Sequence, residues 1–329
     1  MRRLKIGIGR YDRTQALLDG RVTIKGYDAV IESAPLEELF SKAFDHGEYE
    51  VAELSFSNYL YLTCEGQCRY AGLPIFPSRM FRHSAIFIRT DRGIQTPRDL
   101  AGKVVGVREF SMTAALVARG VLEDEYAVSA SSIRWRYGPG DAYDSKPIIR
   151  TRPRGVEIAP IEEGQSLSDL LRDGKLDALV AYKPPKCFTE GAPNIARLFF
   201  DHEAVERDYF ARTGIFPIMH LVGIRRDLAD DSALCLAVCD AFQRAKQQAL
   251  EALSMYQALP VALPWAPADV RRVQALMGPD YWPYGVRANR PAIEAVARYS
   301  FSQGLASRVL GVEELFARPV LSWVPELGK

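Results

Sequence analysis

Short apolar runs alternate with segments of helical periodicity through the first half of the chain. Runs typical of buried strands lie at residues 4–8, 51–54, 85–88 and 103–107. Helical patterns lie at residues 35–44 and 111–122. Strands that alternate with helices in this way predict a mainly parallel α/β sheet. In such sheets, ligands bind beyond the carboxyl ends of the strands, so we expect ligand-binding residues in the loops that follow these runs.

The same pattern restarts after Val107 and continues with strand-like segments near residues 133–137 and 174–180. A strongly apolar stretch at residues 215–224 then resembles residues 84–88 in character. We interpret these two stretches as strands that cross between two α/β lobes with a cleft between them. We predict that residues 1–88 and 215–329 form the first lobe, with helices at its C-terminal end, and that residues 89–214 form the second lobe.

Composition and charge narrow the class of protein. The 329 residues are 48% hydrophobic and 25% charged with a net charge of +1, which is ordinary for a globular protein and gives no sign of nucleic-acid or membrane partners. The first nine residues read directly as a strand, not as a secretion signal, which predicts a cytoplasmic protein. A homo-oligomer is one interpretation, and an aromatic loop at residues 281–284 is a candidate for a lid or for a subunit interface.

Five cysteines include two C-x3-C pairs, at Cys64 and Cys68 and at Cys235 and Cys239. A zinc site is one interpretation, but structural zinc sites more often use C-x2-C. Reduced thiols that are partly buried are the simpler interpretation, and they fit a reducing compartment. We therefore predict no metal site.

The stretch from residue 73 to 116 carries the first candidate site. A strand at residues 103–107 runs through a loop into a helix, so Ser111, Met112 and Thr113 offer backbone N–H groups to an anion. Simple capping of the helix by these residues is the alternative, and it is compatible with binding. Arginines and a histidine crowd the same stretch, which predicts a cleft that binds carboxylates.

Other polar residues follow predicted strands or occupy loops at the same sheet edge. Arg13, Arg79 and Arg82 are the first choices for the carboxylates, because a guanidinium forks onto both oxygens; a solvated charge or a surface salt bridge is the alternative for each. The remaining predicted ligand-binding residues are Tyr11, Asp12, Ser55, Ser57, Asn58, Lys183 and Tyr284.

Three residues are candidates for proton transfer. His83 and His220 flank the two apolar stretches that we interpret as crossings, and a histidine can exchange a proton at cellular pH. The alternative for each is a buried histidine with a structural role. Glu53 lies at a strand end among apolar residues, where burial could raise its pKa and make it an acid; an ion pair with a neighbouring arginine is the alternative. His46 and His202 are predicted to be surface residues.

Motifs along nearly the whole chain carry a family likeness. T-P-x-D-L-x-G-K-x-V-G-V at residues 96–107 and L-x-D-G-K-L-D-A-L at residues 171–179 resemble the type 2 periplasmic-binding-protein fold. More specific motifs resemble the 4,5-dihydroxyphthalate decarboxylase family, namely Y-D-R-T (11–14), V-A-E-L-S-F-S (51–57), F-P-S-R-M-F-R-H-S (76–84), D-E-Y (124–126), G-I-F-P-I-M-H (214–220), Y-W-P-Y-G-V (281–286) and V-E-E-L-F (312–316). The loops at residues 109–114 and 183–188 depart from the pattern of that family.

The resemblance implies a cytoplasmic enzyme that removes CO2 from 4,5-dihydroxyphthalate, or a close analogue, to give 3,4-dihydroxybenzoate. It implies a small aromatic dicarboxylate as partner, ring protonation as the chemistry, and no cofactor. Two other interpretations stay open on the same scaffold. One is a solute-binding protein for an aromatic or sulfonated acid that feeds an ABC transporter, and the other is a ligand sensor or a synthase.

Overall fold

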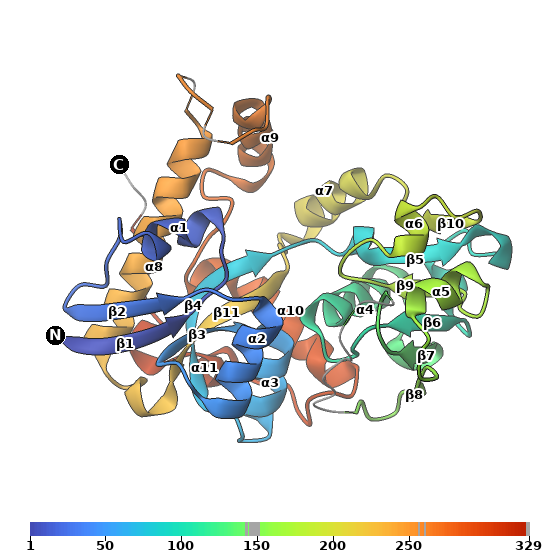
Figure 1. Cartoon of the computed structure of the whole chain (residues 1–329), viewed down its shortest axis with the longest axis horizontal. Coiled ribbons are helices and arrows are strands. Elements are labelled where there is room, and N and C mark those ends of the chain that lie inside the picture. Colours follow the sequence, from blue (N-terminus) through green and yellow to red (C-terminus); the bar gives the residue numbers. More distant parts are fainter. Residues whose placement is uncertain (142–143, 145–151, 256, 260, 327–329) are drawn as a thin grey trace.

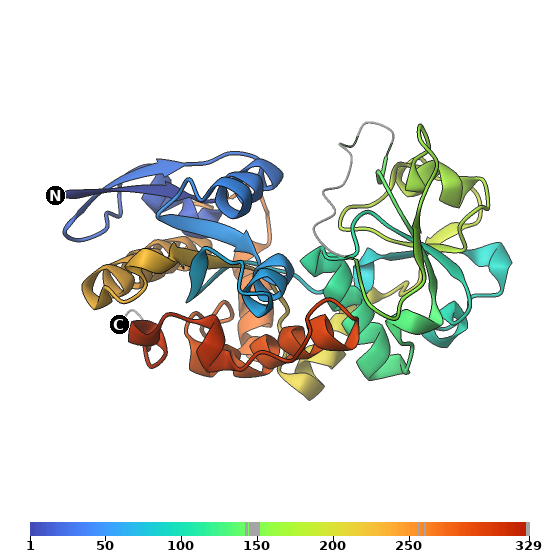
Figure 2. The same cartoon turned by 90° about the horizontal axis from the view of Figure 1, so that it is seen from below.

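The chain forms two α/β lobes that lie side by side (Figures 1 and 2). Its structure is a computed structural model, which describes residues 1–141, 144, 152–255, 257–259 and 261–326. Each lobe is built around one sheet, and the sheets contain five and six strands among the described residues. No helix in this described part of the chain is long and apolar enough to cross a membrane.

The first sheet has a parallel half and an antiparallel half. Its strands in spatial order are β2 (Tyr27–Glu32), β1 (Arg2–Gly7), β3 (Val51–Ser55), β11 (Ile218–Arg225) and β4 (Tyr70–Arg79). β1 runs parallel to β2 and β3, whereas β11 runs antiparallel to β3 and β4. β3 and most of β4 are buried along their length, as expected for strands that are covered on both faces.

The second sheet follows the same plan. Its strands in spatial order are β10 (Ile195–Arg197), β5 (Ile86–Arg89), β9 (Ala178–Val180), β6 (Val104–Val107), β7 (Arg134–Tyr137) and β8 (Ile158–Pro160). The four strands from β9 to β8 are parallel, and β5 runs antiparallel to its neighbours.

Two short segments connect the lobes. β5 belongs to the second sheet and β11 to the first, so the chain crosses at residues 80–85 and again at residues 214–217. The apolar strands that the sequence marks as crossings are therefore not the crossings themselves, and residues 86–88 lie with the second sheet, not with the first lobe. The two segments touch, because Met80 N donates to Pro217 O at 3.2 Å and the rings of Phe81 and Phe216 lie 4.9 Å apart.

The helices of the described residues cover both sheets. They are α1 (Asp12–Leu18), α2 (Leu36–Ser41), α3 (Phe56–Cys64), α4 (Thr113–Tyr126), α5 (Leu167–Arg172), α6 (Lys186–Thr189), α7 (His202–Thr213), α8 (Ser232–Leu253), α9 (Ala266–Met277), α10 (Val286–Ser302) and α11 (Val312–Leu315). A π-helical turn at Lys42–His46 extends α2.

α10 joins the first lobe to α4 of the second, as its reach in Figure 2 illustrates. The helices come close because Gly120 has no side chain: a Cβ atom there would meet the ring of Tyr299 at 2.3 Å. Asp124 accepts hydrogen bonds from Arg298 at 2.7 Å and from Tyr299 at 2.6 Å. These contacts fix the middle and the C-terminal end of α4 relative to the first lobe.

Candidate active site

The ends of β3 and β11 bring predicted polar residues onto one face of the first sheet. His220 is paired with Ser55 of β3 on one side and with Ser78 of β4 on the other, and Val222 is paired with Glu53. Side chains of directly paired residues lie on the same face, as do residues two apart along a strand. Glu53, Ser55, Ser78 and His220 therefore share one face near the crossings.

Glu53 is a fully buried carboxylate with three donors. Its Oε1 lies 2.7 Å from His220 Nδ1 and 2.7 Å from the hydroxyl of Tyr11, and its Oε2 accepts from Gly9 N at 2.7 Å. Burial alone would raise the pKa of this carboxyl, but the hydrogen bonds and the charge of His220 outweigh burial and lower it. The expected net rise in the pKa of Glu53 is therefore wrong, and the residue is a carboxylate that orients its neighbours.

His220 is held in one orientation by this carboxylate. Because Glu53 accepts, Nδ1 carries the hydrogen and the other ring nitrogen, Nε2, is left to face a ligand. The ring of Phe40 packs edge-on against the imidazole at 5.0 Å, and the side chain of His220 keeps 14% of its surface exposed. Burial, and then the charge of Glu53, raises the pKa of Tyr11, so its hydroxyl stays protonated and donates to Glu53.

The start of α4 meets the first lobe beside this pair. Thr113 Oγ1 lies 3.0 Å from Ser55 Oγ and accepts from Ser57 N at 3.0 Å. The first N–H groups of a helix have no partner within the helix, so this end of α4 offers donors and a positive dipole end. Met112 is the N-cap residue and has no side-chain capping bond, so simple capping by its side chain does not account for this end.

Two neighbours add uncommitted polar atoms to the same contact. Ser57 Oγ and Asn58 Oδ1 are buried without a hydrogen-bond partner among the described residues. Ser111 instead donates from its hydroxyl to Glu109 Oε1 at 2.5 Å.

Arg13 is the predicted arginine that lies with Tyr11. Its guanidinium is stacked between the rings of Tyr11 and Trp282, at 4.3 and 4.2 Å from their centroids. It donates to Asp12 Oδ1 at 2.9 Å and to the carbonyl of Pro77. These contacts hold the positive charge near the face that carries Glu53.

A second group of charges lies on the second lobe. Lys183 Nζ lies 2.8 Å from Asp144 Oδ1, and Arg108 Nη1 lies 3.6 Å from Asp144 Oδ2. Arg108 also reaches Glu37 of α2 in the first lobe at 2.9 Å. The loop that holds Lys183 thus faces Arg108 within the second lobe, and Arg108 in turn bridges to the first.

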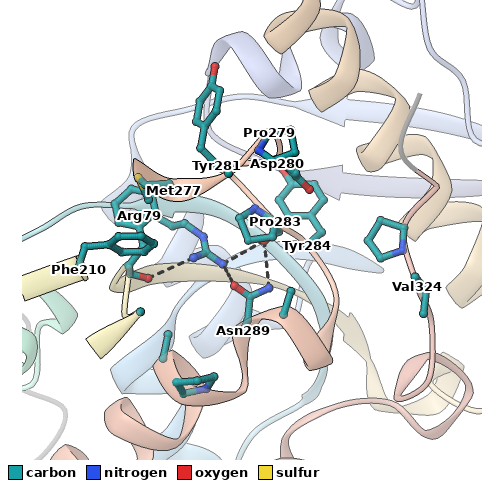
Figure 3. A pocket seen from close by; sticks show the side chains of 17 residues that line it. Arg79, Phe210, Met277, Pro279, Asp280, Tyr281, Pro283, Tyr284, Asn289 and Val324 are labelled. Carbon is teal, nitrogen blue, oxygen red and sulfur yellow. Dashed lines mark hydrogen bonds between the residues drawn. The ribbon is translucent and has the colours of Figure 1, made fainter. Parts of the chain in front are cut away.

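Arg79 is the last residue of β4 and is paired with Ile218 of β11, beyond an irregularity in the register. Its guanidinium donates to Phe216 O at 3.2 Å, to Pro283 O at 3.1 Å and to Asn289 Oδ1 (Figure 3). Burial lowers the pKa of Arg79 to about 9. Tyr284 is fully buried, and burial raises the pKa of its hydroxyl, which also lies within the influence of the charges of Arg13, Arg79 and Glu53. The hydrogen bonds of Arg79 thus go to the second crossing and to the region at the start of α10, and none that the structure describes reaches Glu53 or His220.

Arg82 and His83 belong to the first crossing. Arg82 Nε donates to Met219 Sδ at 3.2 Å, and burial lowers the pKa of this arginine to about 10. His83 is fully buried between the rings of Phe199 and Tyr209, each 5.3 Å away. Neither of its ring nitrogens has a hydrogen-bond partner among the described residues, and burial lowers the pKa of His83 to about 4.

The structure brings some of the predicted residues together around the contact between the lobes and places the others elsewhere. The residues that the structure gathers around the contact between the lobes are Tyr11, Asp12, Arg13, Glu53, Ser55, Ser57, Asn58, Ser111, Met112, Thr113 and His220. Sequence reasoning missed Gly9, Phe40 and Ser78. Gly9 directly follows the first predicted strand, and this position could have revealed it as a backbone donor at the sheet edge.

The described residues contain no group of three or more His, Cys, Asp or Glu side chains that could hold a metal ion. The five cysteines are free thiols, and all but Cys64 are buried. Burial raises the pKa of Cys239 well above its ordinary value and that of Cys235 to about 11. These thiols are protonated and apolar in character, unlike the thiolates that bind zinc.

No protein-family model matches the chain, but two curated proteins do. It is 40% identical over 315 residues to a 4,5-dihydroxyphthalate decarboxylase from Comamonas testosteroni, covering 95% of this chain and 96% of that protein. It is 38% identical over 208 residues to a 4,5-dihydroxyphthalate decarboxylase from Pseudomonas putida, covering 63% of this chain and 81% of that protein.

Solved structures confirm the predicted type 2 periplasmic-binding-protein-like fold. The periplasmic aliphatic sulphonate binding protein SsuA from Escherichia coli matches with a TM-score of 0.53 at 14% identity, over 98% of this chain and 99% of that one. The desulfurization enzyme DSZB also matches with a TM-score of 0.53 at 14% identity, over 98% of each chain. Binding proteins and enzymes share this fold, so the fold alone does not assign an activity.

Proposed function

The chain belongs to the 4,5-dihydroxyphthalate decarboxylase family, and we propose that it uses His220 to protonate the ring carbon from which the carboxylate leaves. It is a carboxy-lyase that decarboxylates a small aromatic dicarboxylate. The observation that carries our assignment of His220 is its 2.7 Å hydrogen bond to the buried carboxylate of Glu53.

The chemistry sets three requirements. An aryl carboxylate leaves as CO2 once its ring carbon has gained a proton, since the electron pair of the broken C–C bond then returns to the ring. A hydroxyl para to that carbon stabilises the protonated ring, and each carboxylate of 4,5-dihydroxyphthalate has such a hydroxyl. The protein must therefore hold two carboxylates, support the hydroxyls and supply one proton. The reaction involves no change of redox state, and we propose that it needs no cofactor.

Glu53 and His220 are suited to the proton transfer. The protonated imidazole donates from Nε2 to the ring carbon, while the Nδ1–H bond to Glu53 keeps the ring aligned and stabilises its positive charge. Tyr11 and Gly9 hold Glu53 in place from the other side. After CO2 leaves, His220 regains a proton from solvent through its exposed edge.

The start of α4 and Arg13 are suited to the carboxylates. The N–H groups at the start of α4 can donate to an anion that enters beside His220, as can the one hydroxyl of Ser55 and Thr113 that accepts in the bond between them. We propose that Arg13 binds the second carboxylate from the first lobe. Arg108 and Lys183 of the second lobe are balanced by nearby acids, namely Glu37, Asp141 and Asp144. A guanidinium already stacked on Tyr11 and Trp282 loses little freedom when it binds.

We also propose a cytoplasmic location, which the five free thiols support, because disulfides rarely form in a reducing compartment. A homo-oligomer is a further proposal that size measurement in solution would test.

The test is turnover of ring-substituted phthalates by the purified protein in D2O. We expect CO2 release from 4,5-dihydroxyphthalate, and from 4-hydroxyphthalate with loss of the carboxylate para to its hydroxyl. The product should carry deuterium at the vacated ring carbon. Phthalate, which lacks hydroxyls, should bind without turnover. Equal turnover of phthalate, or loss of CO2 without deuterium at that carbon, would contradict ring protonation assisted by the hydroxyl.

A further inference from the structure

A cavity lies beside the second crossing, between the end of β4, the loop at residues 277–284 and the start of α10. Its volume is about 450 Å³, within the range of small-molecule sites. It is formed by the loop at residues 277–284, the start of α10, the second crossing and the tail near Val324 (Figure 3). Neither Glu53, His220 nor Thr113 is among the residues that line it.

Arg79 forms part of the wall of this cavity, and its charge lacks a bonded counter-ion. The side chain is 93% buried, since only 7% of the residue surface is exposed. Its three acceptors are two backbone carbonyls and the amide oxygen of Asn289, which are all neutral. Its Nε–H has no acceptor, and no salt bridge to Arg79 occurs in the described parts of the chain. A buried cation without an anion is costly, so this arrangement favours binding of one.

The acid in the cavity wall is already compensated. Asp280 accepts from Lys246 Nζ at 2.9 and 3.0 Å, and Lys246 is itself buried. Asp280 therefore balances Lys246 first, and it leaves Arg79 as the excess positive charge. Because the Asp280–Lys246 pair is neutral overall, the one unpaired charge of the wall matches a ligand with a single negative group.

The remainder of the wall is largely apolar. Phe210, Phe216, Met277 and Pro283 line it together with parts of α10. Aromatic and proline side chains of this kind pack well against a flat ring. The cavity thus combines one positive charge with a hydrophobic chamber.

We propose that this cavity binds an aromatic monocarboxylate, with its carboxylate at Arg79 and its ring against Phe216 and Met277. The site is distinct from the reaction site, because none of Glu53, His220 and Thr113 lines it. It touches both crossings, since Arg79 ends β4 and the cavity is lined by Gly214 and Phe216. If the proposed function holds, the product of the reaction is an aromatic monocarboxylate, and the cavity would then bind the product class in preference to the substrate class.

Titration calorimetry with benzoate tests the proposal without reference to turnover. The protein is first saturated with phthalate, which occupies the reaction site as a dicarboxylate without hydroxyls. Two variants alter the cavity: Arg79→Met removes the charge, and Ala288→Trp fills the mouth from an exposed position on α10. Arg287→Trp is the matched control, since residue 287 is exposed on the same turn of α10 and is not part of the wall.

We expect benzoate to bind the unmodified protein and the Arg287→Trp control with the same affinity. Both cavity variants should weaken the affinity for benzoate by about tenfold or more. Arg79→Met does so because a hydrogen bond to a charged group contributes at least that much, and Ala288→Trp does so because it fills the mouth of the cavity. If Arg79→Met does not fold, Ala288→Trp decides alone. Equal benzoate affinity in Ala288→Trp and the control, or no benzoate binding to the unmodified protein, would overturn the proposal. Absence of decarboxylation would leave these results unchanged, so the two proposals fail separately.

Discussion

His220 and His83 both lie near the segments that connect the lobes, yet their surroundings are opposite. His220 has a carboxylate at 2.7 Å and an exposed edge. His83 is enclosed by Phe199 and Tyr209, and its nearest acid, Glu206, is 3.8 Å from Nδ1. One imidazole is hydrogen-bonded to a buried carboxylate, whereas the other is held neutral because burial lowers the pKa of His83 to about 4.

The difference shows what a histidine needs in order to deliver a proton. A ring that donates from Nδ1 to a fixed carboxylate has a defined orientation and a second nitrogen aimed at the ligand. A ring without hydrogen bonds, in apolar surroundings, contributes packing. We therefore propose His220 as the proton donor and His83 as a structural residue of the first crossing. The predictions below test this contrast in order of the expected loss of turnover.

The largest effect is expected for His220→Gln, which keeps a polar side chain of similar reach but cannot supply a proton. We expect kcat to fall by about a thousandfold, within the range of general acid catalysis. The matched variant His83→Gln should keep kcat within about twofold, a small change for a residue away from the chemistry. Steady-state assays with circular dichroism as the folding control measure both. Equal losses in the two variants would remove the contrast.

Glu53→Gln should have the next largest effect. The amide fills the same space but cannot balance the charge of a protonated His220, so we expect kcat to fall by about a hundredfold. The pH–rate profile should also shift toward acid, because the protonated imidazole loses its counter-charge.

Glu50→Gln is the control for this variant. Glu50 lies just before the same strand, but it pairs with Arg225 at 3.0 Å, away from His220. A profile that moves equally in both variants would show that the effect of Glu53 is not specific to His220.

The contrast between the histidines could not be predicted from the sequence. The alternation of apolar runs and helices predicts the two lobes, and the position of Glu53 at a strand end predicts its place at the sheet edge. His83, in contrast, owes its surroundings to Phe199 and Tyr209, which lie more than a hundred residues further along the chain. Contacts between residues so far apart in the sequence depend on how the chain packs in three dimensions, and no local sequence pattern predicts them.

The orientation of Arg79 has a similar explanation. A sequence shows that Ser78 and Arg79 alternate, but not which of the two faces the site. The register between β4 and β11 decides this, and it shifts at irregularities on both sides of His220. A shift of one residue exchanges the faces, so the grouping of Arg79 with the reaction site could only be tested in three dimensions.

The lobe contact should contribute less than the proton-transfer pair. Thr113→Val keeps the shape of the side chain but removes the hydroxyl that Ser55 and Ser57 N contact at 3.0 Å. We expect KM to rise by about tenfold with a smaller change in kcat, because the lost interactions bind the anion and hold the lobes together. Thr96→Val is the control, since Thr96 caps a turn on the exposed side of the second lobe. A larger loss in kcat than in KM would instead place Thr113 in the chemical step.

His83 should reveal itself in stability, not in turnover. In the unfolded chain His83 takes up a proton near its ordinary pKa of 6.5, whereas in the folded chain it takes up a proton only near its lowered pKa of about 4. The unfolded state therefore binds more protons between these values, and stability falls as the pH is lowered through that window, by about 3 kcal/mol in all. Glu53, whose pKa is lowered from 4.5, loses its stabilising contribution only at more acidic pH.

Urea unfolding between pH 6.5 and about pH 5 separates the contribution of His83 from that of Glu53, since about 2 kcal/mol of the loss from His83 falls in this range. His83→Gln should flatten this part of the curve, whereas the exposed His46→Gln should not. A curve of unchanged slope in His83→Gln would mean that His83 is protonated in the folded state, and the distinction between the two histidines would then lose its physical basis.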